Sequence, residues 1–149
     1  MAQYKTHAKF NIFLALPLLV TAIYFLIPYT PWTLGMFTGS FIYATLYMNP
    51  DLDLANQIKF WSVRGFLTSP FRLYSKVFSH RGLSHSILFG TLTRVLFLAL
   101  LVIGGIWLFT QVTPNANSLF AFLKAHQTIL THCFAGVFLA DICHLILDI

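Results

Sequence analysis

Four long apolar stretches constrain the fold of this chain more than any other feature of its sequence. They span residues 10–28, 32–48, 88–110 and 127–147. A helix of about 20 apolar residues is long enough to cross the hydrocarbon core of a bilayer. Only 9% of the residues are charged, whereas about 25% is usual in a soluble domain. We therefore predict an all-α, polytopic membrane protein in which four transmembrane helices form a single domain over residues 1–149.

The connections between these stretches are predicted from their turn residues and from their amphipathic character. Pro28 and Pro31 indicate a tight turn, so the first two helices should form an antiparallel hairpin. Lys5 and Lys9 before the first stretch would also suit a signal peptide, but no small-residue cleavage signature follows, and we expect a retained anchor. Residues 57–79 alternate aromatic and basic side chains, which favours a helical connection in the membrane interface with its cations on lipid headgroups. This segment lacks the soluble basic surface that nucleic-acid binding requires.

Lysine and arginine residues fall almost entirely on one side of the expected bundle. With four helices, both termini and the connection 49–87 share that side. Lys124 lies near the opposite surface, and Arg94 falls inside the third stretch. The positive-inside rule therefore predicts that the termini and the long connection are cytoplasmic. Seven of the nine cations lie on this side: Lys5, Lys9, Lys59, Arg64, Arg72, Lys76 and Arg81.

The last stretch carries a stripe of possible metal ligands. Asp141, His144 and Asp148 are spaced i, i+3 and i+7, so they share one face of a helix. Asp141 lies roughly 10 Å along the helix from Asp148. A carboxylate at that depth is costly unless it is paired, hydrated or bound to a cation. The alternative to metal binding is a protonated or salt-bridged Asp141 that fixes helix packing.

Arg94 lies at a comparable depth in the third stretch, one helical turn after Gly90. Three interpretations are open. The guanidinium pairs with Asp141, it holds an anionic group of a substrate, or it extends to the membrane interface.

Asp51 and Asp53 follow Asn49 and Pro50 directly after the second stretch. These residues suit an ordinary helix start, with Asn49 as the cap and the acids facing the helix dipole. In an extended segment, side chains at i and i+2 point the same way and could bind one ion together. Because polar residues of the fourth stretch are expected at the same membrane face, we favour the metal role.

Histidines supply the most specific local motif. His80 and His85 flank Gly82 just before the third stretch, and Ser84 is suited to cap the helix that follows. Two imidazoles at such a helix entry can point at one cation. His7, just before the first stretch, is a further candidate ligand. All these residues are expected at the cytoplasmic face.

A series of ordered motifs extends along nearly the whole chain. In this order the motifs resemble those of the bacterial metal-binding membrane proteins of unknown function. They are also similar to the motifs of the YdjM-like membrane-bound metal-dependent hydrolases. The resemblance implies a bacterial inner-membrane location. It also implies that His7, Asp51, Asp53, His80, His85, Asp141 and His144 bind the metal or support its ligands. The motifs are Pro50-Asp51-Leu52-Asp53, Pro70-Phe71-Arg72, His80-Arg81-Gly82-Leu83-Ser84-His85-Ser86, Gly90 with Arg94, and Asp141-x-x-His144-x-x-x-Asp148, preceded by His7.

The main functional hypothesis is a metal-dependent hydrolase of a phosphate ester, including lipid phosphates, with one or two divalent ions. A mixed His and Asp set suits Zn²⁺, Mn²⁺ or Fe²⁺ better than Mg²⁺. Such an ion acidifies water and polarises a phosphoryl oxygen. The expected ligands are His7, Asp51, Asp53, His80, His85, Asp141, His144 and Asp148. The expected catalytic residues are Asp53, His85 and Asp141, and the expected phosphate-binding residues are Arg72, Arg81 and Arg94.

Two other functions remain open at this stage. One is a non-enzymatic metal-binding or metal-transporting membrane protein. Transport would need polar residues across the membrane, and only Thr128, Thr131 and His132 continue toward His126. A structural subunit would use its polar helix ends for packing alone and would bind no metal.

Overall fold

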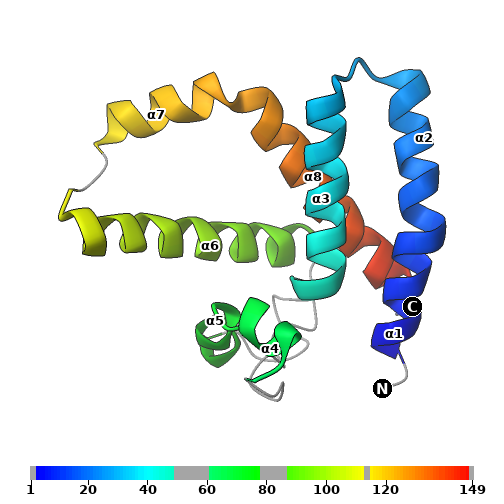
Figure 1. The fold of residues 1–149 in the computed structure, drawn as a ribbon, viewed down its shortest axis with the longest axis horizontal. Coiled ribbons are helices and arrows are strands. Elements are labelled where there is room, and N and C mark those ends of the chain that lie inside the picture. Colours follow the sequence, from blue (N-terminus) through cyan, green and yellow to red (C-terminus); the bar gives the residue numbers. More distant parts are fainter. Residues whose placement is uncertain (1–2, 49–60, 78–86, 113–114, 148–149) are drawn as a thin grey trace.

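The computed structural model describes residues 3–48, 61–77, 87–112 and 115–147 (Figure 1). Within these ranges every regular element is helical, which confirms the all-α expectation. The elements are α1 (Gln3–Phe10), the π-helical turn η1 (Asn11–Ala15), α2 (Leu16–Leu26), α3 (Pro31–Tyr47), α4 (Val63–Leu67), α5 (Phe71–Val77), α6 (Ile87–Thr110), α7 (Ala116–Ala125) and α8 (Gln127–Ile146).

Pro17, in the first turn of α2, accounts for a local widening of the first long helix. α1, η1 and α2 follow one another without a break, and the N–H of Leu16 donates to the carbonyl of Asn11. Proline has no N–H, and its ring crowds the carbonyl four residues before it. A π turn immediately before Pro17 accommodates this crowding while the helix continues. The turn begins at Asn11, whose side chain is buried.

The connection between α2 and α3 is built from the two prolines noted in the sequence. α2 ends at Leu26, and Ile27 adopts extended backbone (φ −127°, ψ 134°). Thr30 then caps α3 by accepting the N–H of Thr33, while the Thr33 hydroxyl accepts the N–H of Thr30. Pro31 occupies the first helical position, where no N–H is needed. α2 and α3 lie side by side and antiparallel (Figure 1), as the prolines predicted.

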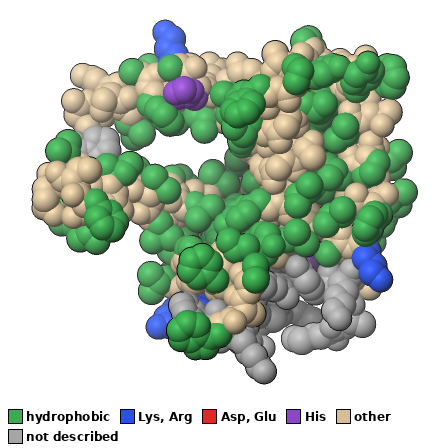
Figure 2. All heavy atoms as spheres, in the orientation of Figure 1, with side chains coloured by type: hydrophobic (Ala, Val, Ile, Leu, Met, Phe, Trp, Pro, Cys, Tyr) green, Lys and Arg blue, Asp and Glu red, His purple; other side chains and the backbone are tan. Residues whose placement is uncertain are grey.

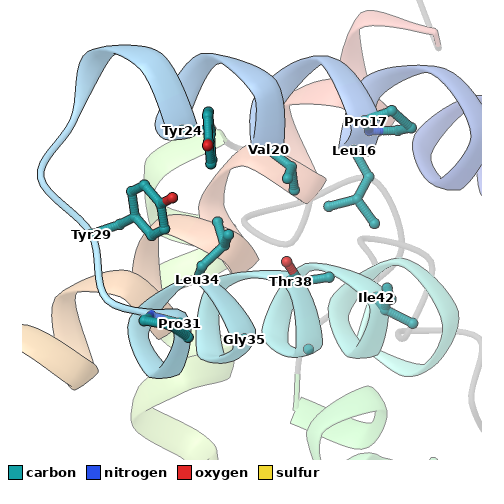
Figure 3. Close-up of a pocket in the computed structure, with 11 residues that line it drawn as sticks. Leu16, Pro17, Val20, Tyr24, Tyr29, Pro31, Leu34, Gly35, Thr38 and Ile42 are labelled. Atoms are coloured by element: carbon teal, nitrogen blue, oxygen red, sulfur yellow. The ribbon is translucent and has the colours of Figure 1, made fainter.

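An open groove of about 710 Å³ runs between α2 and α3 (Figure 3). Tyr24 and Tyr29 lie at the end nearest the connection, and Leu16 and Ile42 lie at the other end. The lining has no acidic, basic or histidine side chain, so it offers none of the usual metal ligands. The lining residues are Leu16, Pro17, Val20, Tyr24, Tyr29, Pro31, Leu34, Gly35, Thr38, Gly39 and Ile42.

The core of the molecule lies where α3 packs against α8, the most extensive contact between two described elements. Phe37 and Phe41 of α3 are fully buried there. Gly136 of α8 lies directly against the α3 backbone, because a Cβ added to it would come within 2.6 Å of the Phe37 carbonyl oxygen. The absence of a side chain at Gly136 therefore lets the two helix backbones approach closely.

Three described helices are long and apolar enough to cross a membrane: Thr6–Leu26, Phe89–Thr110 and Gln127–Ile146. The expectation of four was therefore too high. α3 has 17 residues, or about 26 Å at the usual rise, which is shorter than a hydrocarbon core of about 30 Å. It also buries Phe37 and Phe41 where it packs against α8. Three such helices are compatible with a membrane protein.

α6 begins beside the lower part of α3 and extends with α7 away from the other helices (Figure 1). Leu100, Trp107 and Phe109 of α6 and Phe120 of α7 are exposed. Hydrophobic side chains also cover much of the face seen in Figure 2, and its Lys and Arg side chains lie at the margins. Such a surface suits an apolar surrounding.

The connection expected in the membrane interface is described over residues 61–77. It contains α4 and α5. Phe71 and Tyr74 of α5 are buried beside Phe97 of α6, with ring centroids 6.1 and 5.6 Å apart. Trp61 and Phe66 are exposed instead. The aromatic residues of this connection thus divide between the core and the surface.

Candidate functional site

Buried polar side chains gather where the ends of four helices meet. The N-terminal α1, the end of α3, the start of α6 and the end of α8 all contribute. Figure 1 shows α1 beside the C-terminal end of the chain. Each of the seven side chains is at most 4% exposed: His7, Asn11, Thr45, Thr91, Arg94, Asp141 and His144.

His7 and His144 form a buried pair, although they lie near opposite ends of the sequence. Nδ1 of His7 is 3.4 Å from Nε2 of His144, and either ring nitrogen can be the donor. The ring centroids are 4.4 Å apart and the ring planes are perpendicular. α1 places His7 here because the first long helix runs antiparallel to α3 and reaches the end of α8. The pair brings two imidazoles together at one buried point.

Asn11 links the π turn to two other helices, one helical turn after His7. Its Nδ2 donates to the carbonyl of Ala140 in α8 at 3.1 Å and to Oγ1 of Thr45 in α3 at 3.3 Å. Its Oδ1 is buried and has no hydrogen-bond partner among the described residues. The Asn11 side chain therefore fixes the position of η1 beside the histidine pair.

Asp141 lies one turn before His144 and forms a buried ion pair with Arg94. The two atoms, Oδ2 of Asp141 and NH2 of Arg94, are 2.7 Å apart. The hydroxyl of Thr91 donates to the same oxygen at 2.5 Å. The other oxygen, Oδ1, is buried without a hydrogen-bond partner in the described part of the chain.

Arg94 uses its remaining nitrogens within the protein. Nε donates to the carbonyl of Gly90 at 2.9 Å, and NH1 donates to the carbonyl of Met48 at 2.9 Å. Of the three interpretations open for Arg94, the structure therefore contains the ion pair with Asp141. The side chain is 1% exposed, so it does not extend to an interface, and nothing in this geometry favours contact with a substrate.

Several residues expected in the site lie outside the described ranges. They are Asp51, Asp53, His80, Arg81, His85 and Asp148. Arg72, expected to hold phosphate, is half-buried on α5. His126 is exposed at the start of α8, and His132 bonds to the Thr128 carbonyl of its own helix at 2.7 Å.

The described residues alone do not complete a metal site. No three His, Cys or Asp side chains within these ranges are grouped so that they could hold an ion. The His7 and His144 pair thus supplies two nitrogen donors, whereas a structural zinc site has four ligands.

Sequence reasoning missed Asn11, Thr45 and Thr91, which are uncharged and lie inside apolar stretches. Spacing could have pointed to two of them. Asn11 follows His7 by four residues and Thr91 precedes Arg94 by three, so each shares a helix face with a predicted site residue.

The chain matches the family model described as "Uncharacterized metal-binding protein (DUF2227)" over residues 2–149. The chain belongs to this family. The family description leaves the metal unspecified and gives no reaction. No curated protein and no solved structure matches the chain. Family membership thus supports metal binding and leaves the chemistry to be argued from the residues.

Proposed function

We propose that the chain binds a divalent metal ion at the end of the helix bundle, with His7 and His144 as two of its ligands. One observation carries this proposal: two imidazoles 137 residues apart in the sequence meet at a buried point with their ring nitrogens 3.4 Å apart. Membership of a family described as metal-binding supports it. The further ligands come from Asp51, Asp53, His80, His85 and Asp148, which the sequence predicts at the same face.

The donors fit a borderline metal better than a hard one. Imidazole nitrogen suits Zn²⁺, Mn²⁺ and Fe²⁺, whereas Mg²⁺ prefers oxygen ligands and retains its waters. Imidazole ligands bring no negative charge to the ion, and carboxylates from the Asp-x-Asp motif would balance its charge. We therefore propose one or two ions, with Zn²⁺ or Mn²⁺ preferred.

The reaction we propose is hydrolysis of a phosphate ester, with lipid phosphates among the substrates. A bound divalent ion supplies Lewis acidity toward phosphoryl oxygens and acidifies water. Asp53 and His85 would transfer protons, and Arg72 and Arg81 would hold the phosphate oxygens. We place this enzyme at the cytoplasmic face of a bacterial inner membrane, as the motif resemblance to YdjM-like hydrolases and the positive-inside rule imply. The three long apolar helices are compatible with a membrane protein.

Metal binding without catalysis is the second candidate, since the family description names no reaction. The polar cluster occupies one end of the bundle, which favours a binding site over a transport path, because transport would need polar residues across the membrane. A metal-loaded protein that hydrolyses none of a panel of phospholipids, isoprenoid phosphates and nucleotides would favour this candidate.

The proposal is tested by elemental analysis of protein purified in detergent. Wild-type protein is expected to retain a divalent metal through purification. His144→Ala is expected to retain much less, because the loss of one direct ligand weakens binding by at least about tenfold. His7→Ala should behave in the same way.

His126→Ala is the matched control, because His126 is exposed and precedes the first residue of α8, whereas His144 lies in the last turn of that helix. It should keep the wild-type metal content. If His144→Ala and His7→Ala also keep that content while remaining folded, the histidine pair is not a metal site.

A further inference from the structure

We infer that Arg94 and Asp141 are positioning residues for this metal site rather than a substrate-binding residue and a metal ligand. Together they hold the three helix ends from which ligand-bearing segments leave. This inference rests on the proposed metal site and goes beyond it, because it assigns the only described ion pair of the cluster to the support of that site.

The first step of the argument is the reach of the Arg94 side chain. Its three nitrogens donate to Gly90 in its own helix α6, to Met48 at the end of α3 and to Asp141 in α8. The planar guanidinium fixes the directions of these bonds, which a flexible ammonium group would not do. Arg94 therefore sets the mutual position of α3, α6 and α8 at one point.

The second step is the bond to Met48, which caps the C-terminal end of α3 directly after Tyr47. The final carbonyls of a helix have no partner within that helix and carry partial negative charge. Arg94 satisfies one of these carbonyls at 2.9 Å. The chain continues from Met48 directly into Asn49-Pro50-Asp51, so this bond anchors the point from which the predicted Asp-x-Asp ligands depart.

The third step concerns the two other segments joined to the same point. His144 follows Asp141 by three residues on α8. The predicted ligand His85 precedes Thr91 by six residues, and Thr91 donates to Asp141. Every segment with a predicted ligand, apart from that of His7, therefore adjoins in sequence a residue of this network. The network consists of the contacts among Thr91, Arg94, Asp141 and Met48.

The fourth step separates positioning from direct binding. Oδ2 of Asp141 already accepts two short hydrogen bonds, and the opposite charge of Arg94 neutralises the carboxylate. Only the buried Oδ1 is left without a hydrogen-bond partner among the described residues, and the test below shows whether this oxygen binds the ion. Asp141 also does not form a group with His7 and His144 that could hold an ion. Arg94 is 1% exposed and bonded on three sides, so a substrate phosphate does not reach it.

The test measures Co²⁺ binding by visible absorption, because the bands of Co²⁺ report the type and number of its ligands. The variants are Asp141→Asn, Arg94→Gln and the double variant that carries both. Each single variant leaves one buried charge without its partner, and we expect Co²⁺ affinity to fall about tenfold or more. The double variant removes both buried charges but also loses the bonds that Arg94 makes to Gly90 and Met48, so we expect its affinity to rise above that of the single variants and to stay below that of the wild type. The band positions of the double variant should match those of the wild type.

Arg94→Lys serves as the second variant in case the single neutral variants do not fold. It keeps the charge next to Asp141 but cannot donate in three fixed directions. We expect a folded protein with weakened Co²⁺ binding and unchanged band positions. Unchanged affinity in Arg94→Lys would overturn the positioning role.

Two outcomes separate this inference from the proposed function. Wild-type protein that binds no Co²⁺ would overturn the metal site itself. Wild-type binding, combined with altered band positions in Asp141→Asn, would show that Asp141 is a direct ligand and would overturn the inference alone.

Discussion

At the scale of single residues, the buried polar side chains of this chain join helices to one another. Asn11 bonds η1 to α3 and α8, and Arg94 bonds α6 to the same two helices. A buried ion pair adds little net stability, because desolvation opposes the Coulomb attraction. Removing one partner is nevertheless severe, since it leaves an uncompensated charge. The pair therefore specifies which helix ends meet more than it stabilises the fold.

Thr91→Val tests this network without altering a charge. The substitution removes the 2.5 Å hydrogen bond from the Thr91 hydroxyl to Asp141 and keeps the shape of the side chain. A hydrogen bond to a charged group contributes roughly 2 kcal/mol. We expect the midpoint of thermal unfolding in detergent, followed by circular dichroism, to fall by about 5 °C.

Thr110→Val on the same helix is the matched control. The Thr110 hydroxyl donates at 2.7 Å to the carbonyl of Ile106 in its own helix, at an exposed position. Its substitution should change stability by less than about 0.5 kcal/mol. Equal effects of the two substitutions would mean that the Thr91 bond contributes nothing specific.

The sequence predicted part of this network. The i, i+3 spacing put Asp141 and His144 on one helix face, and the structure buries both. The comparable depth of Arg94 made the ion pair one of three possibilities. Spacing along one helix could not choose among them, because the choice depends on how α6 and α8 are rotated relative to each other.

At the scale of helices, Gly136 decides how closely α3 and α8 pack. A Cβ at this position would lie 2.2 Å from Oγ of Ser40 and 2.6 Å from the Phe37 carbonyl oxygen. The Ser40 hydroxyl can rotate away, but the carbonyl belongs to the helix backbone and cannot. The two helices would have to separate to admit even one methyl group.

Gly136→Ala is therefore expected to destabilise the protein. Overpacking in a core costs about 1–3 kcal/mol, which corresponds to a fall of roughly 2–10 °C in the unfolding midpoint. Gly35→Ala is the matched control on α3, since nothing lies within 4 Å of its added Cβ. Alanine should stabilise that exposed helix position by up to about 1 kcal/mol. A neutral Gly136→Ala would contradict the close approach of the two backbones.

The π turn is a feature that the sequence of the first long helix alone does not predict. Pro17 in an apolar stretch predicts a disturbance of the helix. Whether the helix kinks, ends or widens by one residue depends on the neighbours of the freed backbone groups. Here the widened turn presents Asn11 to α3 and α8, so contacts with both helices accompany the π form.

At the scale of the whole molecule, the exposed apolar side chains and the buried polar cluster lie in different parts of the structure. α6 and α7 expose large apolar side chains, whereas the buried polar residues lie where α1, α3, α6 and α8 meet. α3 brings the chain back to the level of α1, because Thr45 contacts Asn11. The long connection after α3 therefore leaves from the polar end, although α3 is shorter than a full membrane span.

Labelling with a membrane-impermeant maleimide tests whether residues 76 and 124 lie on opposite sides of the membrane, with residue 76 on the cytoplasmic side. Lys76→Cys and Lys124→Cys are made in a Cys133→Ser, Cys143→Ser background, because the chain has two cysteines. Both lysines are exposed, and α6 separates them along the chain. In intact cells, the position-124 variant should be labelled and the position-76 variant should be protected until the membrane is permeabilised. Labelling of both variants in intact cells would contradict this topology.

The sequence by itself determined that the chain is helical, that three of its four long apolar stretches are long enough to cross a membrane, and that Asp141 and His144 of α8 share a face. These properties are local, because they depend on apolar length and on the 3.6-residue repeat of a helix. Only the tertiary structure decided that His7 lies against His144, that Arg94 bonds to Asp141 and Met48, and that α3 serves mainly as a packing partner of α8. Such pairings depend on the rotation and spacing of helices in contact. Close packing at sites such as Gly136 sets both quantities, and no pattern within one helix encodes them.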